Sequence, residues 1–114
     1  MKAYTDIEQS KKLAEFLPLE SADCFWDYDE MQKFHRISWF EDGYNKESQL
    51  IFNENNVCAW SLSALLELIP NWTMDKTDKV NLTCNPYYHC ESCYEDPIDA
   101  VFEMVCWLKE NNKI

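Results

Sequence analysis

The chain has 114 residues, a formal net charge of −11 and an aromatic content of 15%. Its length is typical of one domain, and its Trp, Tyr and Phe residues supply enough large side chains for one core. Acidic stretches repel phosphate backbones, so we expect no direct nucleic-acid binding, and a single glycine excludes the glycine-rich loops that bind nucleotides.

The first predicted helix spans Asp6 to Leu17. Thr5 is expected to be its N-cap, and Glu8 completes a capping box, which satisfies two backbone N–H groups reciprocally. Pro18 follows and ends the helix, because proline lacks the N–H that a helix interior needs.

The central part predicts three strands followed by a helix. Residues 24–29 and 34–40 are rich in aromatic residues and partly alternating, which favours a β-hairpin. Asp42-Gly43 is a turn signal, and residues 49–52 are predicted to return as a third strand. A second helix is expected over Ser61 to Ile69, with apolar residues at helical spacing.

The last part predicts a second hairpin and a final helix. Residues 71–76 are expected to be a polar connection, and 80–84 and 87–94 to pair as strands. Asp96 is expected to cap the last helix, with Pro97 at its first position. The order αβββαββα over residues 1–114 predicts a single α+β domain, with an antiparallel sheet and three helices.

The N-terminus and the cysteines indicate a compartment. Residues 1–5 run into the first helix signal with no apolar signal region, and no stretch is long and apolar enough to span a membrane. We therefore expect a cytoplasmic protein that does not bind membranes. Its cysteines are expected to be reduced, several of them in the core; they are Cys24, Cys58, Cys84, Cys90, Cys93 and Cys106.

One group of residues has the spacing of metal ligands. Cys90 and Cys93 form a Cys-x2-Cys pair, and Cys84 and His89 would supply two more ligands for a tetrahedral zinc. A second Cys-x2-Cys pair is absent, and a regular strand would point His89 and Cys90 to opposite faces. We expect incidental thiols; a zinc-stabilised module is the alternative, and a redox dithiol lacks its usual context.

Catalytic patterns are weak throughout the chain. A cysteine paired with His35 or His89 is the one arrangement for nucleophilic catalysis, and no family signature surrounds any cysteine. We therefore identify no catalytic residue and favour a protein that is not an enzyme. A site for a small ligand or substrate, lined by aromatic residues, remains an alternative.

Four aromatic residues are candidates for contacting a partner: Trp60, Trp72, Tyr87 and Tyr88. Trp and Tyr dominate the residues that carry binding energy at protein interfaces. The alternative for each of them is packing at the edge of the core.

Three segments carry a resemblance. They are residues 4–15 (YTDIEQSKKLAE), 59–66 (AWSLSALL) and 96–104 (DPIDAVFEM). The chain resembles a group of short, uncharacterised proteins encoded in gut bacteria and on their phages and mobile elements. The resemblance implies a cytosolic accessory protein, active in phage–host conflict, and transfers no functional residue.

The leading hypothesis is a non-enzymatic interaction protein that binds a protein partner through an acidic, aromatic surface. Attraction to a basic partner would speed association and weaken with salt. The acidic residues also have a simpler interpretation as a solubilising surface. A homodimer is compatible with the sequence, because an exposed aromatic edge strand favours pairing between copies.

Overall fold

The computed structural model describes residues 3–69, 72–76, 80–84, 88–94 and 96–113, with the backbone only for 73, 75–76, 80–84 and 88–94. Helices and antiparallel sheets make up its elements, which confirms the α+β class. The chain forms two compact units. We call Asp6–Ser61 the hairpin unit, and Met1–Thr5 with Leu62–Ile114 the meander unit. The expectation of one domain over residues 1–114 stays a prediction.

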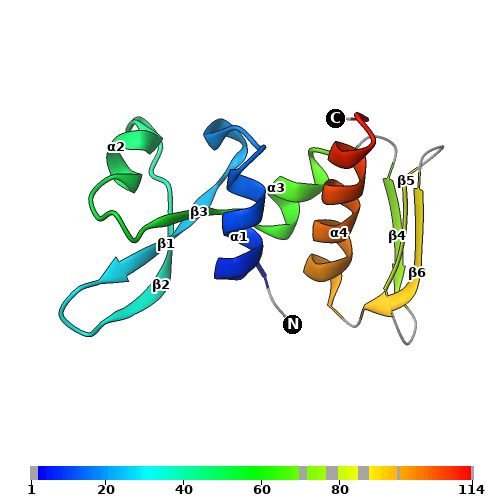
Figure 1. Ribbon diagram of the computed structural model, residues 1–114, viewed down its shortest axis with the longest axis horizontal. Helices are drawn as coiled ribbons and strands as arrows, with labels where there is room; N and C mark the ends of the chain where they lie inside the picture. The colour runs from blue at the N-terminus through cyan, green and yellow to red at the C-terminus, as the bar shows by residue number, and fades with distance from the viewer. Residues whose placement is uncertain (1–2, 70–71, 77–79, 85–87, 95, 114) are drawn as a thin grey trace. The chain divides into compact units, whose positions relative to one another are not determined.

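The hairpin unit is built around a three-stranded antiparallel sheet in the order β2-β1-β3 (Figure 1). The central strand pairs with both neighbours, with Phe25 opposite Ser38 on one side and opposite Cys58 on the other. The helix α1 packs against β3. The elements are α1 (Ile7–Ala14), the 3-10 helix η1 (Leu19–Ser21), β1 (Cys24–Asp29), β2 (Phe34–Trp39), α2 (Lys46–Leu50) and β3 (Val57–Ala59).

The first helix begins one residue later than the sequence predicts. Asp6, not Thr5, is the N-cap: its Oδ1 accepts the Gln9 N–H at 2.8 Å, and Gln9 Oε1 accepts the Asp6 N–H at 3.1 Å. The predicted pair, Thr5 with Glu8, and the observed pair, Asp6 with Gln9, both have the three-residue spacing of a capping box. Thr5 itself is fully buried in the structure. The prediction of Thr5 with Glu8 was therefore wrong by one residue.

The predicted hairpin of residues 24–29 and 34–40 is confirmed, with an unbroken register from Cys24 opposite Trp39 to Asp29 opposite Phe34. The predicted strand at 49–52 is wrong. Asn45 caps the helix α2 there, accepting the Ser48 N–H at 3.1 Å. A run of three apolar residues, Leu50 to Phe52, does not distinguish strand from helix by itself, and here the cap decides. The third strand of this sheet is instead β3.

The meander unit contains a second antiparallel sheet, β4-β5-β6, and two helices. The segment 72–76, predicted as a polar connection, is a strand in register with β5, with Trp72 opposite Cys84. The hairpin of β5 and β6 confirms the prediction. The elements are α3 (Leu62–Leu66), β4 (Trp72–Lys76), β5 (Val80–Cys84), β6 (Tyr88–Tyr94) and α4 (Pro97–Glu110).

The last helix organises the core of the meander unit. Asp96 caps it through the Ile98 N–H and Pro97 occupies its first turn, as predicted. The helix contacts α3 as well as β5 and β6, and Figure 1 shows it between α3 and the sheet. Contacts on two sides explain why its buried residues exceed one stripe: Ile98, Ala100, Val101, Phe102, Met104, Val105, Cys106 and Leu108.

Candidate functional site

Trp60, the first of the predicted interaction residues, lies in the core. Its side chain has no exposed surface, and its indole N–H donates to Ser21 Oγ at 2.9 Å. Its neighbour Ser61 is also buried and donates its backbone N–H to Asp23 Oδ1 at 2.9 Å. In this structure Trp60 therefore has the packing role that the sequence left as the alternative.

Trp72 and Tyr88 lie in one row across the second sheet. Trp72 is 41% exposed at the start of β4, an edge strand, and its backbone lies opposite Cys84. Cys84 in turn lies opposite Tyr88 of β6. Tyr87 lies outside the described residues, and the side chain of Tyr88 is not described. Their role in binding stays a prediction.

The proposed zinc ligands occupy neighbouring strands. Cys84 ends β5, while His89, Cys90 and Cys93 lie in β6, with Cys90 opposite Leu82. The structure describes the backbone of these four residues and not their side chains. Among the described residues, no three His, Cys, Asp or Glu side chains gather in a metal-binding group. The zinc prediction therefore stays a prediction.

The described cysteines behave as core residues. Cys24, Cys58 and Cys106 are buried and are not in disulfides, as the sequence predicts. Burial, the charge of Asp23 and a hydrogen bond with Asp23 raise the pKa of Cys24 far above its ordinary value of 9.0. Burial also raises the pKa of Cys58. Both residues stay protonated at neutral pH, which opposes a nucleophilic role.

His35 has no cysteine among the partners that the structure gives it. Its Nε2 lies 2.9 Å from the backbone oxygen of Asn55. Its ring stands 4.9 Å from the ring of Tyr28, the residue opposite it on β1. These contacts hold the imidazole to the sheet, and among the described side chains none of the contacts given for His35 is to a cysteine.

A site with two exposed aromatic side chains lies elsewhere in the hairpin unit. A cavity of about 310 Å³ opens between the hairpin and the segment that contains α2. Trp39 and Phe52 are 54% and 90% exposed. We call this site the Trp39 groove; its lining residues are Phe25, Asp27, Ser38, Trp39, Glu41, Gln49 and Phe52.

Strand register and ring stacking build the floor of the Trp39 groove. Phe25 and Ser38 lie opposite each other on β1 and β2. The ring of Phe25 stacks on Phe40 with centroids 4.9 Å apart, and Lys46 Nζ lies 5.5 Å from the centroid of Phe40. These contacts connect the hairpin to the start of α2.

Gln49 fixes one wall of the groove. Its Oε1 accepts the backbone N–H of Glu41 at 3.0 Å. Its Nε2 donates to the backbone oxygens of Tyr44 and Asn45 at 3.5 and 3.4 Å. Because one side chain ties the 41–45 loop to α2, Glu41 and the groove are held in a defined place.

The charges along the groove have one sign. Asp27 and Glu41 are the charged residues among its lining side chains, and both are acidic. Arg36, opposite Asp27 on β2, is the nearest base in the register. Two exposed aromatics beside two carboxylates form a surface that suits an apolar segment carrying positive charge.

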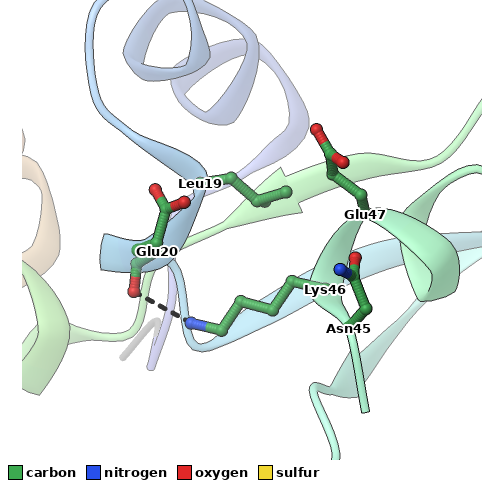
Figure 2. Close-up of a pocket in the computed structure, with 5 residues that line it drawn as sticks. All are labelled: Leu19, Glu20, Asn45, Lys46 and Glu47. Atoms are coloured by element: carbon green, nitrogen blue, oxygen red, sulfur yellow. Dashed lines mark hydrogen bonds between the residues drawn. The ribbon is translucent and has the colours of Figure 1, made fainter.

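A second hollow, of about 390 Å³, lies between η1 and α2 (Figure 2). Lys46 reaches across it and donates from Nζ to the backbone oxygens of Glu20, at 2.9 Å, and Ala22. Glu20 and Glu47 stand around it with Leu19 and Asn45. Because the Lys46 ammonium group already donates to two backbone oxygens, Lys46 is better explained as a link between η1 and α2 than as a binding group for an anion.

Trp39 and Phe52 were not among the predicted interaction residues. Trp39 was assigned to a strand, and Phe52 to a strand that does not form. Aromatic residues at both ends of the segment 34–40 are visible in the sequence, but the sequence does not show which strand of the hairpin lies at the edge of the sheet.

Comparisons of the chain with protein-family models, with curated proteins and with solved structures found no match. In the part of the chain that the structure describes, no helix is long and apolar enough to cross a membrane.

Proposed function

We propose that this protein is a cytoplasmic, non-enzymatic interaction module that binds a partner protein in the Trp39 groove. The observation that carries the proposal is the exposure of Trp39 and Phe52 beside Asp27 and Glu41. The partner segment that fits this surface has apolar side chains for the aromatic residues and Lys or Arg for the two carboxylates.

The exposed aromatic area supports a transient complex. Covering the exposed parts of Trp39 and Phe52 removes on the order of 300 Å² from water, which contributes about 7 kcal/mol at ~25 cal/mol per Å². Association itself costs on the order of 4–15 kcal/mol. The aromatic contacts thus offset much of this cost, and electrostatic attraction and further contacts must supply the affinity.

The net charge of −11 also supports a basic partner. Opposite charge steers encounter and raises the association rate, and salt screens the effect. The resemblance of the three segments to proteins of gut bacteria and their phages extends the proposal to its setting. The partner would be a host or phage protein, and the chain an accessory protein in their conflict.

A defined peptide tests the proposed function. The probe is a fluorescently labelled, ten-residue peptide of alternating lysine and valine, which we call the Lys–Val peptide; a glutamate–valine peptide is its control. We expect fluorescence anisotropy to show binding of the Lys–Val peptide that weakens with salt. Equal binding of the two peptides, or no binding of either, would contradict the proposal.

Matched variants locate the binding. Trp39→Ala should weaken binding of the Lys–Val peptide by about 2 kcal/mol, roughly thirtyfold in Kd, which is typical of a residue that dominates an interface. Ile51→Ala is the control, because Ile51 is 76% exposed beside Phe52 and does not line the groove. An equal loss in both variants would place the binding outside the groove.

A further inference from the structure

The strand β2 forms a long open edge of the first sheet. It pairs with β1 on one side, and within Asp6–Ser61, all of which the structure describes, no strand pairs with its other side. Its six residues, Phe34–Trp39, pair with β1 without a register shift. An edge of this length presents a row of backbone groups to another chain.

The hydrogen-bond pattern identifies which backbone groups face the open side. In an antiparallel ladder, directly opposite residues alternate between hydrogen-bonded and non-hydrogen-bonded pairs. One residue beyond the strand ends, the Phe40 N–H donates to the Asp23 oxygen at 3.2 Å. Counting from this pair, Ser38, Arg36 and Phe34 direct their backbone groups at β1.

The remaining three residues of β2, which are His35, Ile37 and Trp39, direct their N–H and C=O groups away from β1. A second, independent contact agrees with this assignment of hydrogen-bonded and non-hydrogen-bonded pairs. Tyr28, opposite His35, donates its N–H at 2.8 Å to Asn56 Oδ1, on the side of β1 where β3 lies. The pair of Tyr28 and His35 is therefore a non-hydrogen-bonded one.

The two edges of this sheet differ in how they are protected. The strand β3 has three residues, and beyond it Asn56 continues the pairing to β1 with its side chain. The strand β2 contains no proline and no bulge, which are two of the usual devices that prevent strand addition, and Arg36 is its one charged residue. Exposed aromatic residues stand at both of its ends, Phe34 at 42% and Trp39 at 54%.

We propose that β2 receives an extended, basic segment of the partner protein as a fourth strand, with its apolar side chains beside Trp39, on the face that Ile37 shares. The inference rests on the proposed function and adds the binding mode. Backbone hydrogen bonds supply affinity in such strand addition, and alternate side chains supply specificity. Asp27 and Glu41 favour a basic segment, whereas a second copy of this chain would bring another charge of −11.

Amide hydrogen exchange of the wild-type protein, followed residue by residue by NMR, tests the inference. In the free protein we expect slow exchange at Arg36 and Ser38 and fast exchange at Ile37 and Trp39. The saturating Lys–Val peptide should slow exchange about tenfold or more at His35, Ile37 and Trp39, because their N–H groups become bonded. The inward amides should change less.

The outcomes separate the two proposals. If the Lys–Val peptide binds by anisotropy and the three outward amides exchange as before, strand addition is wrong and the proposed function stands. If the peptide does not bind, both fail. If the outward amides become slow with rising protein concentration and no peptide, the edge is occupied by a second copy and the inference is overturned.

A pair of variants supplies a second readout. Ile37→Pro removes the outward N–H, which an edge strand tolerates, while Ile37→Ala removes the same side chain and keeps the N–H. We expect Ile37→Pro to bind the Lys–Val peptide with an affinity at least about tenfold lower than that of Ile37→Ala. Equal affinity in two folded variants would overturn the inference, and a circular dichroism melt establishes that each is folded.

Discussion

The hairpin unit and the meander unit are of similar length and use their apolar residues differently. In the meander unit, α4 has nine buried residues and contacts α3 and the second sheet. Trp72 is the one large exposed apolar residue of this unit among the described side chains. In the hairpin unit, six such residues are exposed: Met31, Phe34, Trp39, Tyr44, Ile51 and Phe52.

This difference indicates a division of roles. A helix packed on two sides uses its apolar residues to stabilise the fold, since burial of each large side chain contributes roughly 1.5–3 kcal/mol. An exposed cluster contributes little to folding and is free to contribute to binding. The meander unit thus uses most of its large described apolar side chains for packing, and the hairpin unit leaves six of its own exposed to solvent.

The largest expected effect compares two tryptophans of the hairpin unit. Trp60→Ala should lower the free energy of unfolding by about 3–5 kcal/mol, because it leaves a cavity where a fully buried indole stood. Trp39→Ala should lower it by less than about 1 kcal/mol, because half of that side chain is exposed. Urea unfolding measures both. Similar losses would mean that Trp39 supports the core, which would remove the contrast.

An intermediate effect concerns the buried thiols of the hairpin unit. The pKa of Cys24 is raised in the folded protein, so the native state holds its proton at a pH where the unfolded chain loses it. The contribution of the protonated thiol to the free energy of unfolding is complete below the ordinary pKa of 9.0. It falls as pH rises above that value, by at most about 1.4 kcal/mol per pH unit for each thiol. Cys58 acts in the same direction.

Urea unfolding at a series of pH values between neutral and alkaline measures this slope. Tyrosine and lysine also titrate at high pH, so Cys24→Ala is the matched variant, and its stability should fall less steeply with pH than that of the wild type. An identical slope in the two proteins would show that the thiol does not contribute.

The smallest expected effect concerns metal in the meander unit. We expect the reduced protein, purified without added metal, to show its bare mass by native mass spectrometry, and a chelator to leave its melting temperature unchanged. A mass excess of one zinc per chain would contradict this expectation. It would assign Cys84, His89, Cys90 and Cys93 to a structural site and make metal a source of stability for the second sheet.

Elements with strong local signals were predicted well. The cap of α4, with Asp96 and Pro97, and the first hairpin depend on residues that are neighbours in the sequence. The segment 49–52 was predicted wrongly because its three apolar residues suit either a strand or a helix, and the cap at Asn45 favours the helix. The strand at 72–76 was missed although Trp72 to Asp75 alternate between apolar and polar, because the segment was interpreted from its polar residues as a connection.

The Trp39 groove was beyond sequence reasoning for a different reason. It requires Phe25 and Ser38 to be opposite each other, and Phe52 to follow a helix held by Gln49. Each relation joins residues from separate elements. The predicted interaction residue Trp60 shows the same difficulty, since nothing in its immediate sequence distinguishes a buried indole from an exposed one.

By itself, the sequence determined the α+β class, the first hairpin, the final helix and the acidic character, because caps, turns and charge act locally or by simple sum. The tertiary structure decided that the strands form two sheets, that β2 is an open edge, and that Trp39 is exposed while Trp60 is buried. Exposure depends on which elements pack over a residue, and that is a property of the assembled fold.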